Sequence, residues 1–311
     1  MTCDKSLDWP EPPCALAPGA PLYPRSLLDL AEPPDPLRTL GKLPPLGGSA
    51  IAIVGTRHPS DAARSFAYDL AFEIAQAGQT IVSGGALGID GAAHRAAIDA
   101  GGVTVAVLPA GFRRPYPPQH VGLFAEILRS GGAVVSEGQE SWAPHPGLFL
   151  RRNRLIAALA NATVVVQAPA RSGALSTARA AMLLKRKLFC VPGSPWDVRA
   201  EGTLALLRRG GEICTSARDV LSVRPLPRRD SARLGPKLAQ DPTNFSKLGE
   251  DAEKLFRYLH LEPAHPDRIA RELDRPTERV QELLLTFELG GLVRRRTDGS
   301  YCLVRGGLAD G

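Results

Sequence analysis

The middle of the chain alternates between short apolar runs and longer amphipathic segments. The runs have the length and composition of buried strands, and the segments repeat apolar residues at helical spacing. We predict strands at 51–54, 80–82, 103–108, 133–135, 163–166, 188–191 and 212–214, and helices at 61–77, 89–100, 118–129, 152–160, 174–186 and 200–209. Because each strand–helix–strand crossover lays a helix on the sheet, this pattern predicts an α/β domain over residues 49–221 with a doubly wound, mostly parallel sheet.

The pattern breaks on both sides of this domain. Residues 1–48 contain three proline pairs, and proline interrupts regular elements. We therefore expect an extension that packs on the core and forms at most a short helix around Leu27–Leu30. Residues 222–248 combine four prolines with six basic side chains, a composition typical of a linker.

Residues 249–305 show a third pattern. It consists of amphipathic helices followed by two strand-prone runs, at 253–261, 265–273, 277–290, 292–296 and 301–304. Thr-Asp-Gly-Ser joins the two runs, and Asp-Gly in such a place is a strong hairpin signal. We predict a small winged helix-turn-helix domain.

Composition narrows the class of protein. The 311 residues are 44% hydrophobic and 23% charged, which is ordinary for a folded protein. A net charge of +6 favours an anionic partner. Five scattered cysteines without CxxC spacing argue against a disulfide framework and a structural zinc site, and fit a reduced, cytoplasmic compartment. We see no signal peptide and no apolar run of bilayer length, and expect no membrane association.

Glycine-rich loops follow several predicted strands, and in open α/β sheets ligands bind at such carboxyl-end loops. Glycine lets a phosphate approach the backbone amides, and a helix N-terminus favours negative charge. The candidate phosphate contacts in these loops are Gly55, Thr56, Arg57, Ser83, Gly84, Gly85, Gly88, Ser172, Gly173 and Thr177. The sequence lacks GxGxxG in its usual place after the first strand, and it lacks the GxxxxGKS/T loop. It therefore lacks the motifs that would best support a dinucleotide oxidoreductase or an ATPase.

A basic cluster with an aromatic residue lies at the start of a predicted helix. Phe149 offers a flat apolar face to an unstacked base, and Arg151, Arg152, Asn153 and Arg154 offer donors to phosphate. This pattern predicts a single-strand nucleic-acid site. The alternative is a solvated helix start whose arginines pair with nearby acids.

Three further side chains allow two interpretations. Asp90 and His94 are four residues apart, on one helix face. They can form an acid–base pair, or Asp90 can cap its helix while His94 packs or contacts phosphate, and we favour the second. Glu137 is a lone carboxylate that can orient an arginine. Since no HExxH, GxSxG or clustered Cys/His set appears, we expect no catalytic residue, no metal, no cofactor and no enzyme.

Ordered motifs run through residues 21–304: Tyr23-Pro24, Ile51–Arg57, Ser83–Asp90 with Ala93-His94, Gly111…Tyr116-Pro117, Ser136-Glu137, Phe149…Arg152-Asn153-Arg154, Ser172–Ala174 with Thr177-Ala178, and Val191-Pro192-Gly193. They resemble the DprA/Smf family, the DNA-processing proteins of bacterial transformation. The resemblance implies an extended Rossmann-like domain that binds single-stranded DNA and forms a homodimer. It also implies a protein that helps load the RecA recombinase and opposes single-strand-binding protein, without being an established enzyme.

The chain departs from the family pattern at several positions. Pro146 stands where some members have a lysine that contacts phosphate, which puts that contact in question. Gln167 stands where the family often has glutamate, and Leu150 where it often has proline. Only some twenty residues precede Tyr23-Pro24, so we expect the N-terminal helical domain of many members to be missing.

The leading hypothesis is a single-stranded-DNA-binding recombination mediator that protects incoming DNA. Arg57, Arg152 and Arg154 would hold successive phosphates together with the glycine-turn amides, and Phe149 would stack on a base. One alternative is a phosphoribohydrolase-like nucleotide enzyme. The other is a duplex-binding regulator acting through the winged helix, for which protein contact and weak duplex contact are equally compatible with the mixed charges.

Overall fold

The structure is a computed structural model that describes residues 9, 12–44, 46, 50–223, 250–261, 264–289, 293–296 and 298–303. The chain divides into two compact units, Met1–Leu226 and Pro227–Gly311. Apart from residues 222 and 223, the linker predicted at 222–248 lies outside the described residues.

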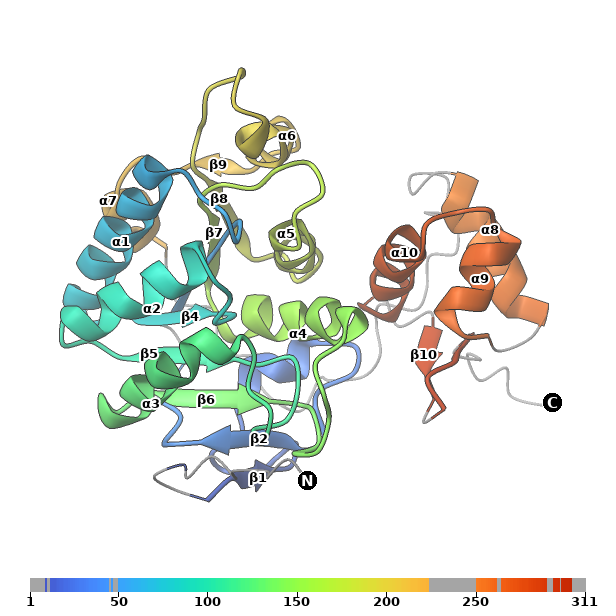
Figure 1. Ribbon diagram of the computed structural model, residues 1–311, viewed down its shortest axis with the longest axis horizontal. Coiled ribbons are helices and arrows are strands. Elements are labelled where there is room, and N and C mark those ends of the chain that lie inside the picture. The colour runs from blue at the N-terminus through green and yellow to red at the C-terminus, as the bar shows by residue number, and fades with distance from the viewer. Residues whose placement is uncertain are drawn as a thin grey trace. The chain divides into compact units, whose positions relative to one another are not determined.

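The first unit is built on one mostly parallel sheet (Figure 1). Its described strands are β1 Cys14–Leu16, β2 Leu37–Leu40, β3 Ala50–Val54, β4 Thr80–Ser83, β5 Thr104–Val107, β6 Ala133–Ser136, β7 Ala162–Val165, β8 Lys187–Cys190 and β9 Glu212–Ile213. They lie in the order β1-β2-β6-β5-β4-β3-β7-β8-β9. The neighbours from β6 to β9 are parallel, whereas β1–β2 and β2–β6 are antiparallel. The predicted α/β fold is confirmed.

Helices cover both faces of this sheet. They are α1 Asp61–Gln76, α2 Ile89–Asp99, α3 Val121–Arg129, α4 Pro146–Leu159, α5 Ala174–Leu183, α6 Glu201–Arg208 and α7 Ala217–Leu221, with 3-10 helices η1 Arg25–Asp29, η2 Pro118–His120 and η3 Val198–Ala200. The chain runs from β3 to β6 through α1, α2 and α3, and then from β7 to β9 in the opposite direction through α5 and α6. Since crossovers are right-handed, the two runs place their helices on opposite faces.

The core explains why β3 lies in the middle. Ile51 and Ile53 of β3 pack with Ile74 of α1 and Ile89 of α2, and all four side chains are at most 3% exposed. All five residues of β3 are buried, although successive side chains point to opposite faces. Such a continuous apolar strand is stable only where helices cover both faces of the sheet.

The N-terminal segment contains more regular structure than its prolines suggest. The predicted short helix is present as η1, but β1 and β2 also extend the sheet beyond β6, which corrects the expectation of at most a helix. The paired residues of both strands contain no proline, so the proline pairs lie outside the ladder. Pairing with β2 covers the edge that β6 would otherwise expose.

Helix α4 begins at Pro146, well before its predicted start at residue 152. Proline suits the first turn of a helix, where its missing N–H has no intrahelical partner. The Nδ1 atom of His145 accepts a hydrogen bond from the Gly147 amide at 3.2 Å and so caps this turn. The earlier start places Phe149 and Arg151 on the helix.

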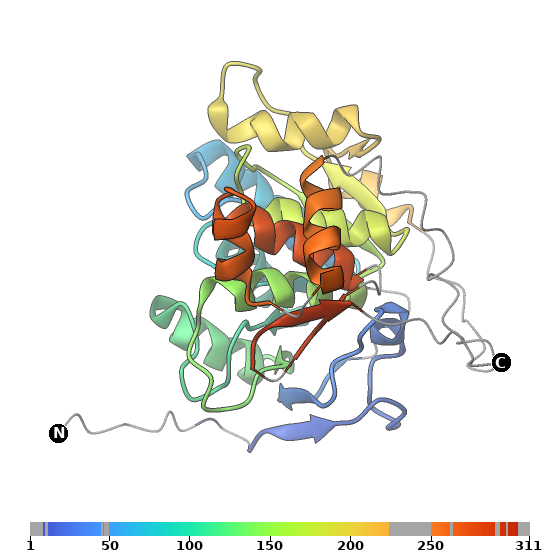
Figure 2. The same cartoon turned by 90° about the vertical axis from the view of Figure 1, so that its right-hand side faces the viewer.

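The second unit is a winged helix (Figure 2). Its described elements are α8 Glu250–Leu261, α9 Pro266–Glu272, α10 Thr277–Leu289, β10 Val293–Arg295 and β11 Tyr301–Leu303. The strands pair antiparallel with Val293 opposite Leu303, and Gly299 has a φ of 85° in the turn between them. Leu255 and Phe287 belong to the core that joins the helices to the hairpin. The predicted C-terminal winged helix is confirmed.

Candidate nucleic-acid interface

The loops that follow β3, β4 and β7 meet at the carboxyl edge of the sheet. The Thr56 amide donates to the carbonyl of Gln167 after β7 at 2.7 Å, and the Ile89 amide donates to the carbonyl of Thr56 at 3.3 Å. Gly88 has a φ of +82°, and a Cβ there would lie 2.5 Å from the Thr56 oxygen, so glycine is required. The sheet order reverses its direction between β3 and β7, which is where open α/β folds form a ligand crevice.

A cation and two aromatic rings from three segments meet beside these loops. The guanidinium carbon of Arg57 lies 5.1 Å from the centroid of the Phe149 ring, and the Tyr116 ring meets Phe149 edge to face with centroids 5.3 Å apart. Arg57 is exposed, Phe149 is half-buried and Tyr116 is 38% exposed. The group thus presents a charge and flat apolar surface at one place. Tyr116 was absent from the predicted site, although Tyr116-Pro117 was among the motifs that carry the resemblance.

Arg152 does not face solvent, which corrects its predicted role as a phosphate ligand. Its side chain is 4% exposed, and its guanidinium donates to the carbonyl oxygens of Gly84 and Val107. A Cβ on Gly84 would lie 2.4 Å from this guanidinium, so the glycine makes room for it. Burial lowers the pKa of Arg152 to about 10, an effect that the nearby Asp90 carboxyl opposes. Arg152 therefore joins α4 to the loop after β4.

Asp90 and His94 have separate partners. The Oδ2 atom of Asp90 accepts hydrogen bonds from the amides of Gly84 at 3.1 Å and Ala86 at 3.3 Å, so these turn amides are directed at a carboxyl group rather than at solvent. Burial raises the pKa of Asp90, while Arg152 opposes the shift. The Nδ1 atom of His94 lies 2.7 Å from the Thr104 hydroxyl, and burial lowers the pKa of His94 to about 3. The contacts favour the packing interpretation over an acid–base pair.

Glu137 pairs with two of the predicted arginines. Its Oε1 atom accepts a hydrogen bond from Nε of Arg151 at 3.0 Å, and its Oε2 atom pairs with the guanidinium of Arg154. Arg154 also donates to the carbonyl of Glu32 at 2.6 Å, and its side chain is 3% exposed. Pairing with nearby acids, the alternative interpretation of this cluster, therefore describes both arginines, and Arg154 is not placed to contact a phosphate directly.

Asn153 holds the loop after β7 against α4. Its Nδ2 atom donates to the carbonyl of Gly173 at 3.1 Å and to the hydroxyl of Ser176 at 2.6 Å. Ser172 is half-buried and Gly173 is exposed, whereas Thr177 is 1% exposed. Ser172 and Gly173, at the end of the loop, are therefore accessible to a ligand, whereas Thr177 lies buried in α5.

The accessible residues define a smaller surface than the sequence predicted. Ser83 is fully buried and donates its hydroxyl proton to the carbonyl of Ile53 at 2.6 Å, so it supports the fold. Gly85 is buried as well. We call the accessible surface the edge site; it consists of Gly55, Arg57, Gly88, Tyr116, Phe149, Ser172 and Gly173.

The winged helix, taken by itself, pairs several of its described charges internally. Arg279 donates to Glu282 at 3.1 Å, and Arg275 donates to Asp251 at 2.9 Å. Arg294 in the hairpin is exposed. These contacts do not separate duplex contact from protein contact, so that choice stays a prediction.

No group of three or more His, Cys, Asp or Glu side chains among the described residues is placed to hold a metal ion. None of the helices described is both long and apolar enough to cross a membrane.

Known proteins resemble both units. A family model described as DNA recombination-mediator protein A matches residues 15–225, and one described as the DprA winged helix domain matches residues 237–299. The DNA processing protein DprA of Mycobacterium tuberculosis is 42% identical over 262 residues, which cover 83% of this chain and 65% of that protein. Protein Smf of Synechocystis is 38% identical over 318 residues, which cover 93% of this chain and 80% of that protein. The chain thus spans about two thirds of the length of the mycobacterial relative.

Solved structures agree with these matches. DprA of Streptococcus pneumoniae superposes with a TM-score of 0.63 at 31% identity, covering 72% of this chain and 77% of that one. DprA of Helicobacter pylori, solved for its single-stranded DNA binding mode, gives a TM-score of 0.61 at 31% identity, covering 67% of this chain and 94% of that one. With both units matched in sequence and the α/β sheet matched in structure, the chain belongs to the DNA recombination-mediator protein A family, also called DprA/Smf.

Proposed function

We propose that this chain binds single-stranded DNA at the edge site and acts as a recombination mediator in natural transformation. The observation that carries the proposal is the exposed Arg57 guanidinium 5.1 Å from the Phe149 ring, at the edge where α/β sheets bind ligands. The single-stranded DNA binding of the H. pylori relative supports it.

Accessible and buried residues have different parts in this proposal. Arg57 pairs with a phosphate, and Phe149 and Tyr116 offer ring faces to unstacked bases. Arg152 and Arg154 act from inside, by holding the loops that present these groups. Since the edge site contains no obvious reader of base edges, we expect little sequence preference.

The test is a salt titration of the full chain with single- and double-stranded oligonucleotides, followed by fluorescence anisotropy. Phosphate contacts release counterions, so the log–log slope for single strands should be about −0.7 per contacted phosphate. Arg57→Ala should weaken binding and flatten this slope by about 0.7. Arg129→Ala removes another exposed positive charge, at the end of α3 before β6, and should leave affinity and slope unchanged. If folded Arg57→Ala bound single strands with unchanged affinity and salt slope, the proposal would be wrong.

The partners of the proposed mediator are further parts of the same hypothesis. We propose that the protein works in the cytoplasm as a homodimer, whose two edge sites would raise avidity on one strand. It would help load RecA onto DNA covered by single-strand-binding protein. Light scattering tests the dimer, and RecA filament assembly on covered DNA tests the loading.

A non-enzymatic role can be tested by an assay for the release of free base. The nucleotide-enzyme alternative requires release of free base from nucleoside monophosphates, and the proposed mediator releases none. Incubation of the full chain with each monophosphate, followed by chromatography of the products, separates the two. Steady release that is lost in Glu137→Gln would favour the enzyme.

A further inference from the structure

The loop that joins β8 to α6 presents a tryptophan to solvent. The side chain of Trp196 is 91% exposed, more than any other large apolar side chain among the described residues. Val198, two residues later, is 66% exposed. Burying so large a ring is favourable, and the fold does not bury it, so the apolar surface of this indole is available to a ligand.

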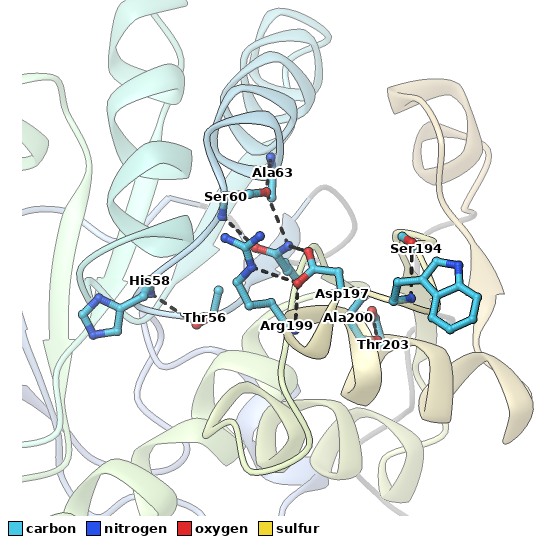
Figure 3. A network of polar contacts seen from close by, with 11 residues as sticks. Thr56, His58, Ser60, Ala63, Ser194, Asp197, Arg199, Ala200 and Thr203 are labelled. Atoms are coloured by element: carbon cyan, nitrogen blue, oxygen red, sulfur yellow. Dashed lines mark hydrogen bonds and ion pairs between the residues drawn. The ribbon is translucent and has the colours of Figure 1, made fainter.

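A polar network holds this loop in place (Figure 3). The Asp197 carboxylate accepts hydrogen bonds from the Gln167 side chain at 3.1 Å and from Nε of Arg199 at 2.9 Å. The amide of Trp196 donates to the Ser194 hydroxyl at 3.3 Å, and the amide of Asp197 donates to the Ser194 carbonyl at 3.0 Å. The backbone is therefore fixed on both sides of Trp196, so binding has to order only the side chain and not the loop.

The same network joins this loop to the edge site. The Oε1 atom of Gln167 accepts a hydrogen bond from the Ser60 amide at 2.9 Å, and the Gln167 carbonyl accepts one from Thr56, which precedes Arg57. Figure 3 shows Asp197 and Arg199 of this loop beside Ser60, with Thr56 on the same side of the network as Ser60. The strands β3, β7 and β8 are consecutive neighbours, so their carboxyl ends span about 10 Å.

The charges of the loop compensate each other. Hydrogen bonds from Arg199 hold the pKa of Asp197 below its usual range, so both groups are charged and form an ion pair. The loop consequently adds no net charge beside the indole. What it can offer a nucleic acid is a ring face rather than a phosphate contact.

We propose that Trp196 is a second base-stacking platform, which extends the path of single-stranded DNA from Arg57 and Phe149 along the sheet edge to the loop after β8. The inference rests on the proposed function and adds a subsite to it. Its position on the same edge, and the direct bonds through Gln167, favour a DNA strand over a protein as the occupant. An oligonucleotide too short to reach the loop gains nothing from Trp196, whereas a longer one does.

Affinity measurements on the full chain test the platform. Trp196→Ala should bind long oligo-dT at least about fivefold more weakly, as expected for one lost stack, with an unchanged salt slope. Trp196→Phe should retain most of the affinity. The matched control is Val198→Ala, which removes an exposed apolar side chain of the same loop and should bind like the wild type.

Fluorescence gives a direct readout. The chain has three tryptophans, and Trp9→Phe with Trp142→Phe leaves Trp196 as the only one. Oligo-dT should quench its emission. If the double variant fails to fold, the difference in quenching between the wild type and Trp196→Phe replaces it.

The outcomes separate this inference from the function it extends. Wild-type affinity of Trp196→Ala at every length, with unquenched Trp196 emission, overturns the platform, while Arg57→Ala still tests the edge site. If Trp196→Ala no longer self-associates and oligo-dT leaves Trp196 emission unquenched, the ring contacts a protein. That result also overturns the platform. A wild type that does not bind single strands ends both proposals.

Discussion

At the scale of single residues, burial decides what each arginine does. The guanidinium groups of Arg57 and Arg152 are chemically identical and lie near the same loops. Arg57 is exposed and lies against an aromatic ring, whereas Arg152 is 4% exposed and donates hydrogen bonds to two carbonyl oxygens. A guanidinium stays charged in both settings, so its surroundings alone separate a ligand contact from a structural one.

Replacing Arg152 should cost stability. Arg152→Ala leaves the carbonyl oxygens of Gly84 and Val107 without their donor and Asp90 without its nearby cation. Each buried acceptor left without a donor lowers the free energy of unfolding by about 1–3 kcal/mol. Urea unfolding measures the loss, and Arg57→Ala, an exposed change, should stay within about 0.5 kcal/mol of the wild type. Equal stability of the two variants would contradict the assigned role.

His94 should make stability depend on pH. The Thr104 hydroxyl donates to the carbonyl of Ile81, so Nδ1–H of His94 donates to Thr104 and Nε2 carries no proton. The pKa of His94 is lowered to about 3 in the fold, against about 6.5 in the unfolded chain. The unfolded state therefore takes up a proton first, and stability falls as pH drops from about 6.5 towards 3.

The comparison protein is His94→Gln, which keeps a donor at this position but does not titrate. Between pH 7 and pH 5 the wild type should lose about 2 kcal/mol more unfolding free energy than this variant. Urea unfolding at the two pH values measures the difference. Identical pH dependence would mean that the fold accepts a charged His94 at no cost.

At the scale of elements, α4 organises the carboxyl edge. Its first three turns contribute Phe149 to the ring cluster, Arg152 to the loop after β4, Asn153 to the loop after β7 and Arg154 to Glu137. Sequence periodicity predicted the second half of this helix. It missed the first half, because Pro146 there is a helix start rather than a break.

The loop contact at Gly88 can be tested through its backbone. Gly88→Ala introduces a Cβ 2.5 Å from the Thr56 carbonyl at a φ of +82°, so the loop after β3 must move. We expect a loss of at least about 1 kcal/mol in unfolding free energy and weaker single-strand binding. Gly122→Ala, in α3 with open space around it, should be neutral or stabilising by about 0.5–1 kcal/mol. Similar results for both variants would contradict this contact.

At the scale of the whole molecule, the edge site belongs entirely to the first unit. Deleting residues 227–311 removes the second unit and leaves every residue of that site. We expect the shortened protein to keep its single-strand affinity and salt slope in anisotropy titrations. Any loss confined to double-stranded oligonucleotides would assign duplex contact to the winged helix. A loss of single-strand binding by folded protein would contradict the location of the site.

The sequence by itself determined the elements, the glycine turns, the hairpin and the family, because strand and helix periods and turn conformations depend on neighbouring residues. Only the tertiary structure decided which predicted contacts remain accessible. Arg154 reaches a carbonyl 122 positions away, and Arg152 reaches one 68 positions away. No local pattern records such contacts, so an arginine that is buried and one that is free to bind look alike until the chain is folded.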